Sequence, residues 1–237
     1  WTYLITGCPN RSVPDDSRDN PFNIRGRDPS MLMIAVPSSY KGKESWYLNR
    51  WFRSRMSAPM TLGREGERIA DSLARGLEDK DSIINRMFIY VRDHVHYLQI
   101  DTGFSGIIPA PACEVIKSRQ GDCKAMANLL ACMLKHTGLD ARIGIIGADD
   151  CEKDFSFPSI ACGNHMICVT IVDGKTRFLD PTNRFSGGIL PGGMIEGRTV
   201  FVLGPDFPQY LKIPVSDPYF NREKCTILLS SRDGNLS

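Results

Sequence analysis

Residues 120–124 read QGDCK and stand directly before an apolar-periodic run at residues 125–135. Apolar residues recur in this run at the three- and four-residue intervals of an amphipathic helix, at Met126, Leu129, Leu130, Met133 and Leu134. Asp122 is a favourable N-cap residue, and Gly138 is a favourable helix stop. The pattern therefore predicts a helix that begins at or next to Cys123.

A cysteine at the start of a helix lies at the positive end of the helix dipole, close to unpaired backbone N–H groups. This position favours the thiolate of Cys123, and the same N–H groups can hold a developing oxyanion. The alternative interpretation is that Cys123 is a small apolar core residue. The residues downstream favour the catalytic interpretation.

A β-hairpin is predicted downstream of this helix. Residues His165–Val172 alternate and are rich in β-branched side chains, which is typical of a strand. Asp173-Gly174 is a two-residue type I′ turn signal, and Lys175–Leu179 returns as the partner strand. Such a turn pairs the last residue of the first strand with the first residue of the second.

In this register Asp180 lies opposite Ile167, on the same face as His165. His165 and Asp180 become diagonal neighbours, with backbones roughly 7–8 Å apart and side chains able to meet. A slip of one residue would put them on opposite faces. The sequence thus offers the residues of a thiolate–imidazolium couple, Cys123 and His165, with Asp180 as a carboxylate that orients the ring.

Three motifs in this order resemble the transglutaminase-like superfamily: Gly121-Asp122-Cys123, Asn164-His165, and Leu179-Asp180-Pro181-Thr182. The resemblance extends from Trp46 to Val202. It is closest to the bacterial transglutaminase-like proteins whose core lies between two β-rich domains of unassigned function. The run at residues 109–124 is similar to that subgroup's approach to its nucleophile.

The resemblance implies an α+β fold with a papain-like/transglutaminase-like core. A helical N-terminal half would pack on an antiparallel β-sheet, with the nucleophile at the N-terminus of the central helix. Cys123 would be the nucleophile, His165 the general base and acid, and Asp180 the orienting carboxylate. The implied reaction is acyl transfer on a protein or peptide amide through a thioester. Hydrolysis is slightly favoured over transamidation because bacterial members include proteolytic ones. The alternative is a catalytically silent scaffold or peptide-binding domain.

A second oxyanion donor besides the Cys123 backbone N–H is expected from the extended segment at residues 94–100. In transglutaminase-like folds an aromatic donor from upstream of the nucleophile has this role. Tyr97 and Gln99 are the candidates, and a half-buried packing tyrosine is the alternative interpretation of Tyr97.

Composition excludes several other functions. Lys and Arg number 29 against 27 Asp and Glu, so the formal net charge of +2 indicates neither nucleic acid nor an anionic membrane as a partner. No apolar run approaches the roughly 20 residues of a membrane span. An aromatic and Arg-containing segment at residues 45–55 is interpreted as core packing rather than as a nucleic-acid surface.

No metal or cofactor is expected. The eight cysteines form no CxxC pair, and His94 and His96 have no third ligand at a diagnostic spacing. Nothing resembles the acidic loops of calcium-dependent animal enzymes. The pair most favoured as a disulfide is Cys151 with Cys162, which flank a loop, whereas Cys132 and Cys168 are expected to be buried core residues.

Three segments are predicted along the chain. Residues 1–40 would be the exit segment of a preceding β-rich domain, 41–205 the catalytic core, and 206–237 a linker and the first strand of a following domain. The resemblance further implies flanking β-rich domains in the full-length chain and an extracytoplasmic, periplasmic or secreted, location.

Overall fold

The computed structural model describes residues 36–99, 106–148, 155, 158–185, 187, 192, 194–217, 219, 225, 231–232 and 235–236. The chain divides into two units, Trp1–Met33 and Ile34–Ser237, and every described residue belongs to the second. Most of the predicted exit segment at 1–40 therefore lies outside the described residues.

The α-helices of this part of the chain are α1 (Glu44–Arg53), α2 (Gly63–Ala74), α3 (Lys80–His94), α4 (Ala112–Ser118) and α5 (Cys123–His136). The strands are β1 (His96–Tyr97), β2 (Gln120–Gly121), β3 (Asp140–Ile146), β4 (His165–Val172), β5 (Lys175–Leu179), β6 (Thr199–Val202), β7 (Gln209–Lys212), β8 (Ser231–Arg232) and β9 (Asn235–Leu236). None of the described helices is long and apolar enough to cross a membrane.

The main sheet has five strands in the order β5-β4-β3-β6-β7, and every neighbouring pair is antiparallel. The helices precede the sheet in the chain, so the predicted α+β arrangement of a helical half and an antiparallel sheet is confirmed. Strand β7 pairs with β6 beyond residue 205. The sheet therefore extends past the end that the sequence predicted for the core.

The β4–β5 hairpin has the predicted register. Val172 pairs with Lys175 and Cys168 with Leu179, so the next position along the ladder sets Asp180 against Ile167. The turn residues Asp173 and Gly174 have φ angles of 51° and 74°. Positive φ at both central positions is the requirement of a type I′ turn, which explains the Asp-Gly sequence.

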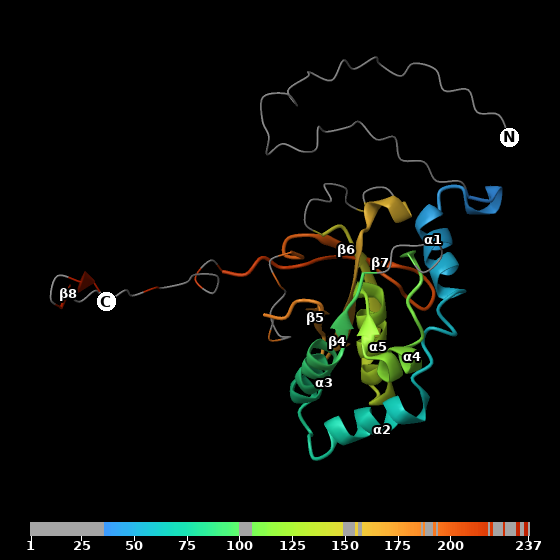
Figure 1. Ribbon diagram of the computed structural model, residues 1–237. Helices are drawn as coiled ribbons and strands as arrows, with labels where there is room; N and C mark the ends of the chain where they lie inside the picture. Colours follow the sequence, from blue (N-terminus) through green and yellow to red (C-terminus); the bar gives the residue numbers. More distant parts are fainter. Residues whose placement is uncertain are drawn as a thin grey trace. The chain divides into compact units, whose positions relative to one another are not determined.

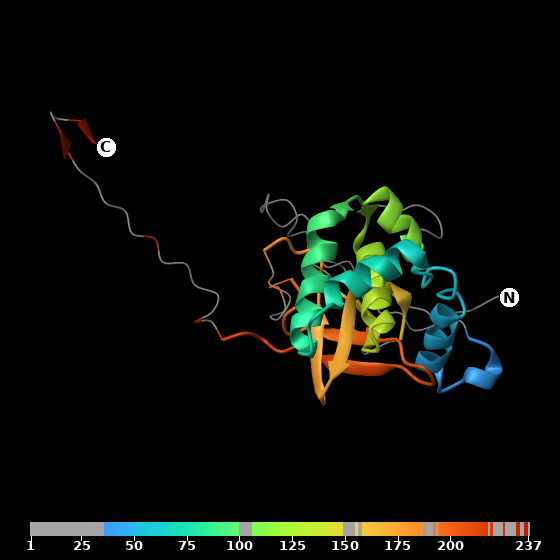
Figure 2. The ribbon, with the colours of Figure 1, turned by 90° about the horizontal axis from the view of Figure 1, so that it is seen from below.

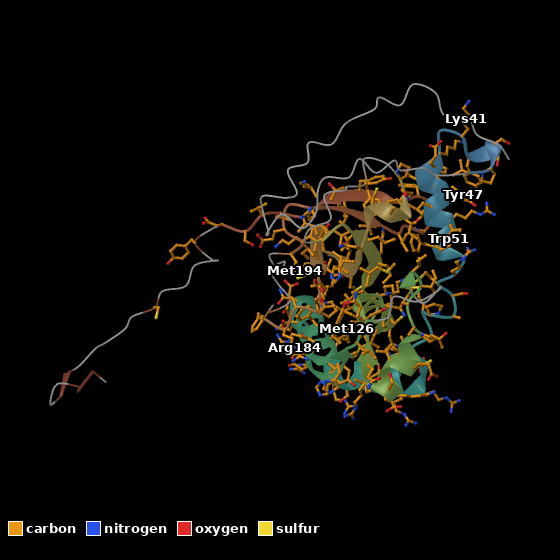
Figure 3. All side chains as sticks on the ribbon, turned by 45° about the horizontal axis from the view of Figure 1, so that its top comes forward. Lys41, Tyr47, Trp51, Met126, Arg184 and Met194 are labelled. Atoms are coloured by element: carbon orange, nitrogen blue, oxygen red, sulfur yellow. The ribbon has the colours of Figure 1, made fainter. Side chains whose placement is uncertain are left out.

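Helix α5 is the centre of the helical layer. It packs on β3 and β4, and α3 and α4 pack against it (Figure 1). Figure 2 shows α2, α3, α4 and α5 gathered on one face of the main sheet. Residues Cys123 to Leu134 are all buried, and Met126, labelled in Figure 3, lies in this interior. Helix α5 is therefore surrounded by apolar contacts along most of its length, which fixes its first residue in space.

Local side-chain chemistry fixes the ends of the other helices. The Asp79 carboxylate caps α3 by accepting from the Ser82 N–H at 2.8 Å, and Asp81 pairs with Arg177. Helix α2 ends at Ala74, just before the left-handed Gly76. In α1, Leu48 and Phe52 are buried as expected, whereas Trp46 is 50% exposed.

Candidate active site

Cys123 is the first residue of α5, as the sequence predicts. The Asp122 carboxylate accepts from the Ala125 N–H at 2.9 Å and so caps the helix. Gly121 precedes the cap, and a Cβ atom there would lie 2.9 Å from the Ala125 Cβ atom. A larger residue would push β2 away from α5, so glycine is needed for this approach to the nucleophile.

His165 and Asp180 meet across the β4–β5 hairpin. His165 Nε2 lies 2.9 Å from Asp180 Oδ2, and both side chains are buried. The other carboxylate oxygen, Oδ1, accepts from the Thr182 N–H at 3.1 Å and from the Thr182 hydroxyl at 2.7 Å. Thr182 therefore orients the Asp180 carboxylate, which in turn orients the His165 ring. The sequence motif at residues 179–182 did not reveal this role of Thr182.

The charges of this pair stabilise each other. Burial alone lowers the pKa of His165, but hydrogen bonds to Asp180 and Cys123, together with the charges of both groups, raise it to about 10. Burial alone raises the pKa of Asp180, but the His165 and Thr182 hydrogen bonds and the imidazolium charge hold it below its ordinary value. His165 is therefore an imidazolium at neutral pH, and Asp180 is a carboxylate.

Cys123 lies next to His165 in the same cleft, and its hydrogen bonding and charge are among the causes that raise the pKa of His165. Because Nε2 of His165 faces Asp180, Nδ1 is the ring nitrogen left for the Cys123 thiol. Cys123 is only 7% exposed, yet it lines a cleft of about 250 Å³. The cleft is lined by Phe52, Tyr97, Gln99, Gly106, Ile107, Asp122, Cys123, Lys124, Ile145, Ile160, Gly163, Asn164, His165 and Met166.

Tyr97 and Gln99 reach this cleft through a pairing that the sequence did not predict. Strand β1 runs parallel to β2, with Tyr97 opposite Gly121, and the Leu98 N–H donates to the Gly121 carbonyl at 3.0 Å. Alternate residues of an extended segment share one face, so Tyr97 and Gln99 both face the cleft. Both candidate oxyanion donors thus lie in the same cleft as Cys123.

Asn164 connects the start of β4 to the chain that leaves β3. Its side chain accepts from the Ala148 N–H at 2.8 Å and donates to the Ala148 carbonyl at 3.2 Å, and its backbone N–H donates to Ile146. These bonds fix the residue directly before His165. Asn164 therefore positions the backbone of His165.

We expect Asn164→Ala to lower the free energy of unfolding by about 1–2 kcal/mol, because two partly buried hydrogen bonds are lost. The same change displaces His165, so alkylation of Cys123 by iodoacetamide at pH 6.5 should fall by roughly tenfold. Urea unfolding and peptide mass spectrometry measure the two effects. The control is Asn183→Ala, which removes a local bond that the Asn183 side chain accepts from the Phe185 N–H at 3.0 Å. Equal effects of the two variants would contradict this role.

A buried ion pair flanks the nucleophile and was missed from the sequence. Lys124 Nζ lies 2.5 Å from Asp122 Oδ2, and the two side chains are 7% and 5% exposed. Asp122 was recognised only as a helix cap, and Lys124 only as part of a motif. The sequence feature that could have predicted the ion pair is the placement of an acidic and a basic residue on either side of Cys123. Two residues that flank the first residue of a helix can contact each other across its first turn.

Among the described cysteines, Cys123 alone lines this cleft. Cys132 and Cys168 are buried, as expected, and burial raises the pKa of the Cys132 thiol to about 12. Cys162 is fully buried, and Cys151 lies outside the described residues, so the disulfide between Cys151 and Cys162 stays a prediction. Among the residues that the structure describes, no three His, Cys, Asp or Glu side chains lie close enough together to hold a metal ion.

The sequence model of the Transglutaminase-like superfamily (Transglut_core) matches residues 67–167, a span that contains Cys123 and His165. The match supports a transglutaminase-like core within this chain. The match begins in α2 and ends in β4, so it covers the helical layer and the strand that carries the histidine. Among curated proteins, no relative matches this chain at a significant level.

One solved structure supports the fold of this core, and two others are less similar to it. A candidate protease from Parabacteroides distasonis superimposes with a TM-score of 0.56 at 18% identity, covering 73% of this chain and 31% of that one. This chain therefore spans about a third of the length of that protein. A candidate cysteine protease from Cytophaga hutchinsonii gives a TM-score of 0.40 at 17% identity, covering 50% and 37% of the two chains. A TGase gives a TM-score of 0.33 at 13% identity, covering 68% of this chain and 37% of that one. The Parabacteroides distasonis structure, together with the matched family model, supports an α+β fold of the transglutaminase-like type.

Proposed function

We propose that this protein is a cysteine-nucleophile enzyme that cleaves protein or peptide amides through a thioester, with water as the acyl acceptor. The observation that carries the proposal is the chain of contacts from Cys123 to His165 to Asp180, with Cys123 at the start of a buried helix and on a cleft. Such a chain supplies a nucleophile, a proton carrier and a charge that holds the carrier in place.

In the first half of the reaction the Cys123 thiolate attacks the carbonyl carbon of the amide. The carbonyl oxygen becomes an oxyanion, which the Cys123 backbone N–H at the α5 N-terminus can hold, with Tyr97 or Gln99 as the second donor. His165 then gives its Nδ1 proton to the amide nitrogen. The C–N bond breaks, the amine leaves, and the acyl group stays on Sγ as a thioester.

In the second half, neutral His165 removes a proton from water as the water attacks the thioester carbonyl. The C–S bond breaks, the carboxylic acid is released, and thiolate and imidazolium are restored. Asp180 keeps the imidazole ring oriented in both halves and compensates its charge. A primary amine in place of water would give transamidation by the same steps. We favour water, in keeping with the candidate protease from Parabacteroides distasonis that shares the fold.

The test is to incubate the protein with mixtures of peptide amides, with and without a labelled primary alkylamine. Mass spectrometry follows an acyl adduct on the Cys123 peptide, newly formed carboxylates and labelled amides. We expect acid products, and we expect Cys123→Ala to reduce them by about a thousandfold or more because the thioester cannot form.

The products separate the candidate functions. Labelled amides in excess over acids would make the protein a transamidase. A thiol that reacts with iodoacetamide but never carries an acyl group from any peptide would favour the catalytically silent, peptide-binding alternative and contradict the proposal.

A further inference from the structure

The ion pair between Asp122 and Lys124 brackets the nucleophile in the chain. Asp122 uses its two carboxylate oxygens for different partners: Oδ1 accepts from the Ala125 N–H at 2.9 Å, and Oδ2 lies 2.5 Å from Lys124 Nζ. Both residues line the cleft with Cys123, and their side chains are at most 7% exposed. A buried lysine is rare unless it is paired, so this pairing is specific to the site.

The charge of Asp122 conflicts with the chemistry of its neighbour. Water screens a buried carboxylate poorly, so a negative charge one residue before Cys123 opposes formation of a thiolate there. The same charge would compete with Cys123 for the His165 imidazolium. The Lys124 ammonium cancels it, and Asp122 can then cap α5 without disturbing the pair.

Among the described residues, few other charged groups line the cleft around Cys123. The titratable groups that line the cleft with Cys123 are Tyr97, Asp122, Lys124 and His165, and Asp180 lies behind His165. The Asp122–Lys124 pair adds no net charge, so the His165 imidazolium keeps Cys123 and Asp180 as its anionic partners in this set. Neutrality of the flanking pair thus leaves the thiolate–imidazolium couple intact.

We propose that Lys124 is a positioning residue that neutralises the helix-capping Asp122 and so keeps Cys123 reactive, an inference that rests on the proposed function of Cys123. It predicts that Lys124 matters through its charge rather than its volume. It also predicts that the need for Lys124 disappears when Asp122 loses its charge.

The test compares Lys124→Met with the double variant Asp122→Asn/Lys124→Met. The rate constant for iodoacetamide alkylation of Cys123 is measured by peptide mass spectrometry between pH 5 and 9. Lys124→Met should react about 10- to 100-fold more slowly at pH 6.5, with its rise in rate moved to higher pH. The double variant, in which Asn still caps the helix, should recover to within about fivefold of the wild-type rate.

Two further variants complete the set. Lys124→Arg keeps the charge and should retain most of the rate. Lys117→Met is the matched control, because Lys117 forms an exposed ion pair with Glu114 at 3.0 Å on α4, and its rate should equal that of the wild type.

A wild-type rate in Lys124→Met would overturn the inference. So would a double variant as slow as Lys124→Met, because the lysine would then act through packing. If circular dichroism shows that Lys124→Met is unfolded, the alkylation rate of the double variant is the test. A rate within about fivefold of the wild type supports the inference, and a slower rate overturns it. The proposed function fails separately, when the wild type reacts no faster than His165→Ala.

Discussion

His165→Ala will slow the alkylation of Cys123 by iodoacetamide by about 100-fold at pH 6. The expectation follows from the charge on the ring. Asp180 and Cys123 raise the pKa of His165 to about 10, so the imidazolium persists throughout the neutral range and holds the thiolate by charge and hydrogen bond. A thiol of ordinary pKa, about 8.5, is on the order of 0.3% thiolate at pH 6. Removing the imidazolium returns Cys123 to that regime.

The measurement must resolve individual cysteines. Cys113 and Cys225 are free and at least partly exposed, so bulk thiol titration would hide the signal from Cys123. Peptide mass spectrometry at short reaction times separates them. The rate of the wild type should change little between pH 6 and 8, whereas that of His165→Ala should climb with pH.

The matched control is His136→Ala. His136 Nε2 lies 2.8 Å from Asp71 Oδ1, so it forms a His–Asp pair like that of His165, but on the surface. Its removal should leave the alkylation of Cys123 unchanged. If His136→Ala and His165→Ala behave alike, or if the wild type titrates as an ordinary thiol, then Cys123 is not activated by His165.

The sequence predicted the parts of this site that rest on local periodicity. Helix α5 and its cap at Asp122 follow from side-chain spacing and cap chemistry, both of which act within one or two turns. The β4–β5 register follows from the Asp173-Gly174 turn, and this register brought His165 and Asp180 together. Short-range rules were sufficient because the two halves of the hairpin are adjacent in the chain.

The parts that were missed depend on tertiary structure. The parallel pairing of β1 with β2 involves only two residues in each strand, too few for a sequence pattern, yet it brings Tyr97 to the cleft. Cys162 was assigned to a loop on the sequence alone, and nothing in the sequence shows that its side chain is fully buried. Burial of Lys124 is likewise decided by the elements that pack around α5, which sequence spacing does not reveal.

Asp180→Ala should lower the free energy of unfolding by roughly 3–5 kcal/mol near pH 6, because it leaves His165 buried without its counter-charge. The loss should depend on pH in a definite direction. The pKa of His165 is raised, so its stabilising contribution is complete below its ordinary value of 6.5 and is lost as the pH rises through about 10. The pKa of Asp180 is lowered, so its contribution is present above its ordinary value of 3.8 and is lost as the pH falls below that value.

The difference between wild type and Asp180→Ala should therefore be largest between about pH 4 and 6.5 and should shrink steadily toward pH 10. Urea unfolding followed by circular dichroism at pH 5.5, 7.5 and 10 measures it. Asp71→Ala, which breaks the exposed pair with His136, is the control and should cost less than about 1 kcal/mol at every pH.

Asp180→Asn separates charge from orientation. Asn keeps an oxygen that can accept from His165 Nε2, as in the Cys-His-Asn arrangement of papain-like proteases, but it carries no charge. We expect this variant to lose most of the pH-dependent stability and to keep more Cys123 reactivity than Asp180→Ala. If both variants unfold with the wild-type pH dependence, the imidazolium is stabilised by a group other than Asp180. If Asn removes reactivity as completely as Ala, the carboxylate charge, rather than its hydrogen bond, is what Cys123 requires.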